Sequence, residues 1–165
     1  MTTRLMSAAA IAALSIALTA CMSAGDGTPV AQFADYQGWT RVNTQTITGD
    51  VTGTLGSAHE GTQGFREVYV NEAGRVVALG DSSPPFPAGT ILVKESHKAD
   101  GNGAKGDLAN LTIMVKREAG YDAANGNWEY VMTTPAKSVR MQGKLGMCIN
   151  CHAAAESSDF VFTRR

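Results

Sequence analysis

A short motif near the C-terminus, Cys148-Ile149-Asn150-Cys151-His152, contains the residues of this chain that are best suited to chemistry. Its two thiols are three residues apart, and a histidine directly follows the second. This is the spacing of the attachment signal for a c-type haem, in which the thiols add to the porphyrin vinyl groups and the imidazole binds iron. The motif therefore predicts one covalent haem c, with Cys148 and Cys151 as tethers and His152 as the iron ligand.

Two other chemistries also use a Cys-x-x-Cys pair. A structural zinc site would need two more ligands at recognisable spacing, but Cys21, His59 and His97 are isolated in the sequence. A thioredoxin-like dithiol is expected beside a βαβ pattern and has no need of the following histidine. Haem attachment is the interpretation that uses both thiols and the histidine.

The N-terminal segment has the pattern of an export signal. Arg4 precedes an uncharged run rich in Ala, Ile and Leu, from Leu5 to Leu18, which is too short to be a comfortable membrane span. The run ends in Leu18-Thr19-Ala20-Cys21, which resembles a bacterial lipobox. We expect residues 1–20 to be a lipoprotein signal peptide, Cys21 to be acylated and residues 21–30 to be a tether. An ordinary signal peptide cleaved nearby is the alternative.

Lipidation at Cys21 would place the protein in the periplasm on a lipid anchor. Each buried acyl methylene contributes about 0.8 kcal/mol, so two or three chains hold a protein firmly. Met22 follows the cysteine, and for a bacterial lipoprotein a residue other than aspartate there implies the outer membrane.

Composition limits the remaining possibilities. Without the first twenty residues 145 remain, enough for one domain with a modest core, which we place at residues 31–165. The formal net charge is −1 and both signs are interspersed, so there is no basic field that would indicate nucleic-acid binding.

The pattern between tether and motif is mainly that of β-strands, because short segments rich in Val, Ile, Tyr, Phe and Thr are bounded by turn residues. We expect an antiparallel sheet, with a hairpin turn at Asn71 to Gly74 and helical segments only at Ala31 to Gly38 and Ala136 to Ala155. The second helical segment should be broken before Cys148 because Gly143 and Gly146 interrupt it. The expected strands are Phe65 to Val70, Arg75 to Leu79, Thr90 to Glu95, Leu111 to Lys116 and Trp128 to Thr133.

A sixth iron ligand would have to come from upstream of the motif, because only thirteen residues follow His152. Four methionines are available, but Met114 and Met132 fall inside expected strands, where a flexible thioether usually fills the core. We therefore expect an open sixth position, which would bind small molecules. The other two methionines are Met141 and Met147.

Four segments match one known family in order and spacing. They are residues 65–71 (FREVYVN), residues 86–95 (FPAGTILVKE), residues 126–128 (GNW), and the haem motif with residues 159–164 (DFVFTR) behind it. With these segments the chain resembles cytochrome P-460 and its relatives, the β-sheet cytochromes c′. The resemblance implies a mostly antiparallel β fold, a homodimer and a haem with an open distal position.

The resemblance also implies a special role for Lys94, whose side-chain nitrogen would bond covalently to a meso carbon of the porphyrin. Such a bond would distort the macrocycle and so alter the haem chemistry. Strand alternation places Lys94 on one face with Thr90 and Leu92. By itself it does not decide whether that face meets the haem, and a strand lysine is ordinarily solvated.

Family members that oxidise hydroxylamine hold a carboxylate above the iron, and we align Thr112 with that position. Threonine cannot act as a base near neutral pH. Asp107, Glu118 or Glu67 could accept the proton instead, although the better interpretation of each is an ordinary surface carboxylate. Arg66 matches a family arginine and could donate hydrogen bonds to a ligand or a propionate, or form an exposed ion pair. Phe86 lies close in sequence to the lysine segment and could approach the haem edge.

Two functions stay open, with an electron carrier as a third. The protein could oxidise hydroxylamine or a related small nitrogen compound and pass electrons to a partner cytochrome, which Lys94 favours. It could instead bind nitric oxide or another gas without turnover, which Thr112 favours.

Overall fold

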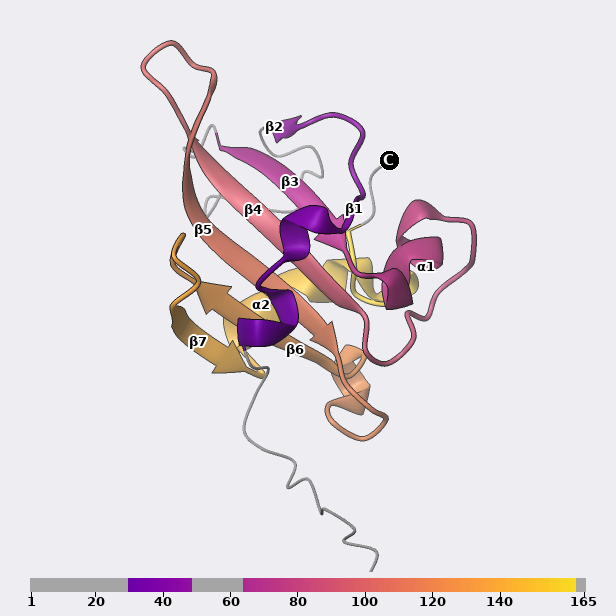
Figure 1. Ribbon diagram of the computed structural model, residues 1–165. Helices are drawn as coiled ribbons and strands as arrows, with labels where there is room; N and C mark the ends of the chain where they lie inside the picture. Colours follow the sequence, from indigo (N-terminus) through magenta and orange to yellow (C-terminus); the bar gives the residue numbers. More distant parts are fainter. Residues whose placement is uncertain (1–29, 49–63, 163–165) are drawn as a thin grey trace, which may run out of the picture.

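The computed structural model describes residues 30–48 and 64–162, and its centre is one antiparallel sheet (Figure 1). The strand order is β1-β3-β4-β5-β6-β7, and β2 also pairs with β3. This mainly β architecture with short helices confirms the predicted fold class. The strands are β1 (Thr40–Arg41), β2 (Ile47–Thr48), β3 (Phe65–Val70), β4 (Ile91–Ala99), β5 (Lys105–Lys116), β6 (Trp128–Thr133) and β7 (Val139–Gly143).

The expected signal peptide, Cys21, His59 and nearly all of the expected tether lie outside the described residues. None of the described helices is long and apolar enough to cross a membrane.

Short helices cover both faces of the sheet. In Figure 1 the indigo N-terminal segment lies in front of the sheet and the yellow C-terminal segment lies behind it. The front segment contains the 3-10 helices η1 (Val30–Phe33) and η2 (Tyr36–Gly38), and the rear segment contains α2 (Gly146–His152) and η6 (Ala153–Ser158). The remaining helices are η4 (Glu72–Gly74), α1 (Arg75–Leu79) and η5 (Ala123–Asn125).

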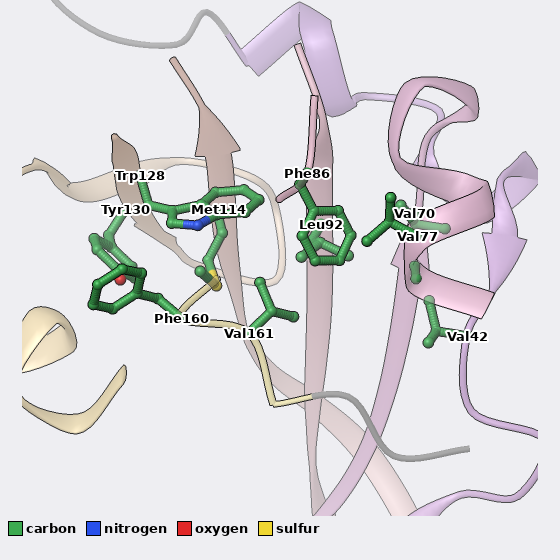
Figure 2. Packing of buried hydrophobic residues seen from close by; sticks show 11 residues of the cluster. Val42, Val70, Val77, Phe86, Leu92, Met114, Trp128, Tyr130, Phe160 and Val161 are labelled. Carbon is green, nitrogen blue, oxygen red and sulfur yellow. The ribbon is translucent and has the colours of Figure 1, made fainter. Parts of the chain in front are cut away.

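Each covered face buries its own hydrophobic cluster, because successive strand residues point to opposite sides. The cluster beneath α2 runs from Trp128 and Tyr130 through Met114 and Leu92 to Val70 (Figure 2). Helix α2 adds Cys148 and Ile149 to this cluster. The opposite cluster packs η1 and η2 on the sheet and consists of Phe33, Tyr36, Ile91, Val93, Leu111, Ile113, Val115 and Val131.

Two of the expected strands have the observed bounds, β3 and β6, and two are longer than expected, β4 and β5. The expected strand Arg75 to Leu79 is wrong, because these residues form α1. The Asn71 side chain accepts a hydrogen bond from Gly74 N and starts a 3-10 turn instead of a hairpin, and Gly80 ends α1 at φ 78°. Packing of Val77 on the core overrides the β-propensity of this short run.

The helix expected at Ala136 to Ala155 is wrong in its first part. Residues Val139–Gly143 form β7 and pair with β6, and the helical structure begins only at Gly146. Gly143 has φ 118°, a conformation that a helix cannot contain and that glycine adopts freely. The break expected before Cys148 is therefore confirmed.

Candidate haem site

Helix α2 presents the two thiols of the motif on successive turns. Residues three apart on a helix lie on the same side, so Cys148 and Cys151 can reach one ligand together. Both cysteines are free and half-buried, and Cys148 packs against the core cluster of that face. Burial raises the pKa of the Cys148 thiol, and the charge of Lys94 partly opposes this.

The imidazole of His152 is held in one orientation. Its Nδ1 lies 2.6 Å from the carbonyl oxygen of Phe160, and a carbonyl only accepts, so Nδ1 carries the proton. The rings of Tyr130 and Phe162 contact it at centroid distances of 5.4 and 5.3 Å. Burial lowers the pKa of His152, which favours the neutral form. Nε2 is therefore the nitrogen left to bind a metal, and the bond at Nδ1 orients the ligand as in other metal sites.

Lys94 lies on the same face of the sheet as the motif. In the register of β3, β4 and β5 it is flanked by Val68 and Thr112. Burial lowers the pKa of Lys94, and the charge of Arg66 lowers it further. The structure gives its amine no carboxylate partner among residues 30–48 and 64–162, so the neutral, nucleophilic form is more accessible there than in an exposed lysine.

Two hydroxyls on this face are buried without a hydrogen-bond partner in the described part of the chain: Thr112 Oγ1 and Tyr130 OH. Their strands put them on diagonal positions, because Thr112 is opposite Met132 and Tyr130 is opposite Met114. Burial raises the pKa of Tyr130, so this phenol stays protonated and able to donate. A buried hydroxyl without a hydrogen-bond partner lowers the stability of the fold. Two of them on one face fit a site in which a bound group supplies part of the hydrogen bonding.

These residues fit a haem. The thiol pair would supply tethers and the oriented His152 a nitrogen ligand. Two hydroxyls without a partner in the described residues and the amine of Lys94 face the same side. The structure places Cys148, Cys151, His152, Lys94 and Thr112 on one side of the sheet. Tyr130 was missed, although strand alternation already placed it on one face with Trp128 and Met132; the register then sets it opposite Met114.

The other expected residues are placed as follows. Arg66 is on the haem side, two positions from Val68 along β3, and its charge acts on Lys94. Phe86 is buried and packs edge-on against Trp128 with the centroids 5.7 Å apart. Asp107 and Glu118 are exposed. Of the methionines, Met114 is in the core, Met132 is partly buried, and Met141 and Met147 are exposed.

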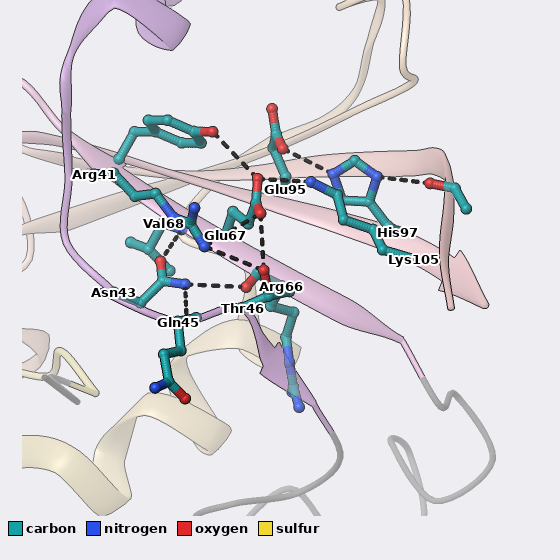
Figure 3. A network of polar contacts seen from close by, with 12 residues as sticks. Arg41, Asn43, Gln45, Thr46, Arg66, Glu67, Val68, Glu95, His97 and Lys105 are labelled. Carbon is teal, nitrogen blue, oxygen red and sulfur yellow. Dashed lines mark hydrogen bonds and ion pairs between the residues drawn. The ribbon is translucent and has the colours of Figure 1, made fainter. Parts of the chain in front are cut away.

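Glu67 lies on the opposite face, in a polar network that was not predicted (Figure 3). One carboxylate oxygen of Glu67, one of Glu95 and a ring nitrogen of His97 lie within 4.8 Å of one another, close enough to hold a metal ion. Glu67 is already bound by Arg41 at 3.2 Å and Lys105 at 2.8 Å. The network therefore has the character of a satisfied ion-pair cluster, and His97, isolated in sequence, belongs to it.

A thiol pair and an oriented histidine above one face of an antiparallel sheet define a haem-binding cytochrome built on a sheet. The comparison with family models agrees, since the model described as cytochrome P460 matches residues 33–163. The chain belongs to the cytochrome P460 family, and its cofactor is haem. The comparison with curated proteins gives no match.

Proposed function

We propose that this protein is a mono-haem c-type cytochrome that oxidises hydroxylamine or a related small nitrogen compound and passes the electrons to a partner cytochrome. The observation that carries the proposal is the position of Lys94. The amine of this partly buried lysine has no carboxylate partner in the described residues and shares one face with Cys148, Cys151 and His152. A bound haem would supply a redox-active iron for this chemistry.

Each side chain has a defined part in this proposal. Cys148 and Cys151 add their S–H groups across the two vinyl groups, which forms thioethers without any net oxidation. His152 binds iron through Nε2, because Nδ1 donates to Phe160 O. Burial lowers the pKa of Lys94, which makes its neutral form more accessible. Its nitrogen would bond to a meso carbon and distort the ring; this bond replaces one N–H and the meso C–H, so it forms only with a two-electron oxidant such as a peroxide.

A gas-binding module without turnover is the second candidate, and Thr112 favours it. Oxidation of hydroxylamine releases protons, and Thr112 cannot accept them. Of the buried carboxylates in the described residues, only Asp159 lies on this side, and it is bound by Lys116. A stable nitrosyl complex with no multiple turnover would support this candidate.

The reduced visible spectrum tests the cross-link. Co-expression with a haem-attachment system should give bands that are red-shifted and broader than those of ordinary haem c. Lys94→Leu should return the bands to the ordinary position. Lys98→Leu, an exposed lysine on the same strand, should keep the shifted bands. An unshifted wild-type spectrum would overturn the cross-link.

Turnover tests the reaction. The purified protein should consume hydroxylamine in the presence of an electron acceptor, and Thr112→Glu should accelerate this by adding a base. Thr112→Val is the matched control, since it removes the hydroxyl without adding a carboxylate. Binding of nitric oxide without any consumption of hydroxylamine would favour the gas-binding function instead.

We also propose a periplasmic location on a lipid anchor at Cys21 and a homodimeric state. Cys21→Ala should release the protein from the membrane fraction. If the segment is instead an ordinary signal peptide cleaved nearby, the wild-type protein should also be found in the soluble fraction. Light scattering of the delipidated protein should give twice the mass of one chain.

A further inference from the structure

The backbone turns sharply just after the haem motif. Asp159 and Phe160 follow η6 with φ values of 55° and 63°, both in the left-handed region. Aspartate enters this region with some ease, but a bulky residue such as phenylalanine does so rarely. Two such residues in succession persist only where the surroundings hold them. We call residues 159–160 the corner.

A buried ion pair holds the corner to the sheet. Lys116 Nζ, at the end of β5, donates to both carboxylate oxygens of Asp159, at 2.7 and 2.6 Å. The backbone N–H of Phe86 donates to the same carboxylate at 2.8 Å. Lys116 and Asp159 are only 8% and 9% exposed, so solvent screens their interaction weakly.

Two further contacts fix the backbone of the corner. The indole Nε1 of Trp128 donates to Asp159 O at 2.8 Å, and Lys116 Nζ lies 5.0 Å from the centre of that indole. Gly126 packs so closely that an added Cβ would lie 2.6 Å from Phe160 Cδ2. The corner is therefore anchored to β5, β6 and the segments before β4 and β6.

The orientation of the corner matters because the Phe160 carbonyl accepts the hydrogen bond from His152 Nδ1, at 2.6 Å. We propose that the Lys116–Asp159 ion pair is a positioning device for the iron ligand. It aims the Phe160 carbonyl at Nδ1, which fixes the tautomer of His152 and makes Nε2 a stronger electron donor. This inference rests on the proposed ligation of iron by His152.

The test uses the haem-loaded protein and two variants of the pair. Lys116→Met removes the cation and keeps a chain of similar length. Asp159→Asn keeps an acceptor for Phe86 N and a residue tolerant of left-handed backbone, so it isolates the charge and should still fold. Lys105→Met is the matched control, since it breaks a lysine–glutamate pair of 2.8 Å on the same strand but on the opposite face.

Two readouts report on the ligand itself: the iron–histidine stretching frequency of the ferrous protein by resonance Raman, and the midpoint potential. Both variants should lower the frequency and raise the potential, because a weaker bond at Nδ1 makes the imidazole a poorer donor. The effect should be larger for Lys116→Met. The control should match the wild type in both.

The outcomes separate this inference from the proposed function. An iron–histidine band in the wild type that stays unchanged in both variants, with an unchanged potential, would overturn the positioning role alone. A wild-type haem without any iron–histidine band would overturn ligation by His152 and with it the positioning role. Shifts of equal size in Lys105→Met would show a general loss of stability and would also overturn the inference.

Discussion

The two faces of the sheet differ in whether their buried polar side chains have hydrogen-bond partners. On the face under η1 and η2, Glu95 accepts from Tyr36 OH at 2.7 Å and lies 2.8 Å from His97, while Glu67 is bound by two cations (Figure 3). On the face under α2, Thr112 Oγ1 and Tyr130 OH have no partner in the described residues. The first face stabilises the fold, and the second leaves hydrogen bonding for a cofactor.

This difference has an energetic cost. A buried polar group without a partner costs about 1–3 kcal/mol, whereas a satisfied one contributes modestly to stability. A chain selected for stability alone would replace such hydroxyls by apolar groups. Their presence beside Cys148, Cys151 and His152 therefore indicates that the haem face is shaped by function.

The largest expected effect concerns the thiols of the haem face. Cys148→Ser combined with Cys151→Ser should abolish covalently bound haem, because hydroxyls do not form thioethers. The measurement is haem that stays with the polypeptide after denaturation and acid–acetone extraction. Asn150→Ser, inside the motif but exposed, should retain full attachment. Haem that survives extraction from the double variant would contradict the assignment of the tethers.

A second prediction compares the same substitution on both faces. Tyr36 and Tyr130 are 1% and 3% exposed, but within residues 30–48 and 64–162 only Tyr36 donates to a protein group. Tyr36→Phe should lower the free energy of unfolding by about 1–3 kcal/mol, because Glu95 loses a donor. Tyr130→Phe should cost less in the same urea titration and should instead shift the visible spectrum. Equal losses of stability with unchanged spectra would remove the distinction between the faces.

The smallest effect is a change in pH dependence. Burial by itself raises the pKa of Glu67, but the hydrogen bonds from Lys105 and Thr46 outweigh it and lower the pKa to about 2. A carboxyl whose pKa is lower in the folded state stabilises the fold above its ordinary pKa near 4.5, and this stability is lost as pH falls toward 2.

Glu67→Gln should therefore flatten the fall in stability between about pH 4.5 and pH 2, measured as urea midpoints across that range. The haem spectrum should not change, because Glu67 faces away from α2. Glu72→Gln, an exposed glutamate paired with Arg75, is the control and should keep the wild-type slope. A wild-type slope in Glu67→Gln would show that another group governs the acid transition.

Local sequence predicted those parts of the fold that local rules govern. β3 and β6 were predicted with the observed bounds because β-branched and aromatic residues fill them and turn residues border them. α1 and β7 were mispredicted for one physical reason. Short segments take the structure that their neighbours impose: Val77 packs into the core as part of a helix, and residues 139–143 become a strand because β6 offers a free edge.

The sequence by itself predicted the haem motif, because covalent attachment would need only two thiols and a histidine at fixed spacing along the chain. Through the family resemblance it also predicted a bond between Lys94 and the porphyrin. Only the tertiary structure decided which face of the sheet carries the site, that Glu67 is on the other side, and that Lys116 and Asp159 hold the carbonyl that orients His152. These depend on pairings between distant residues, and such pairings exist only once the strands are in register.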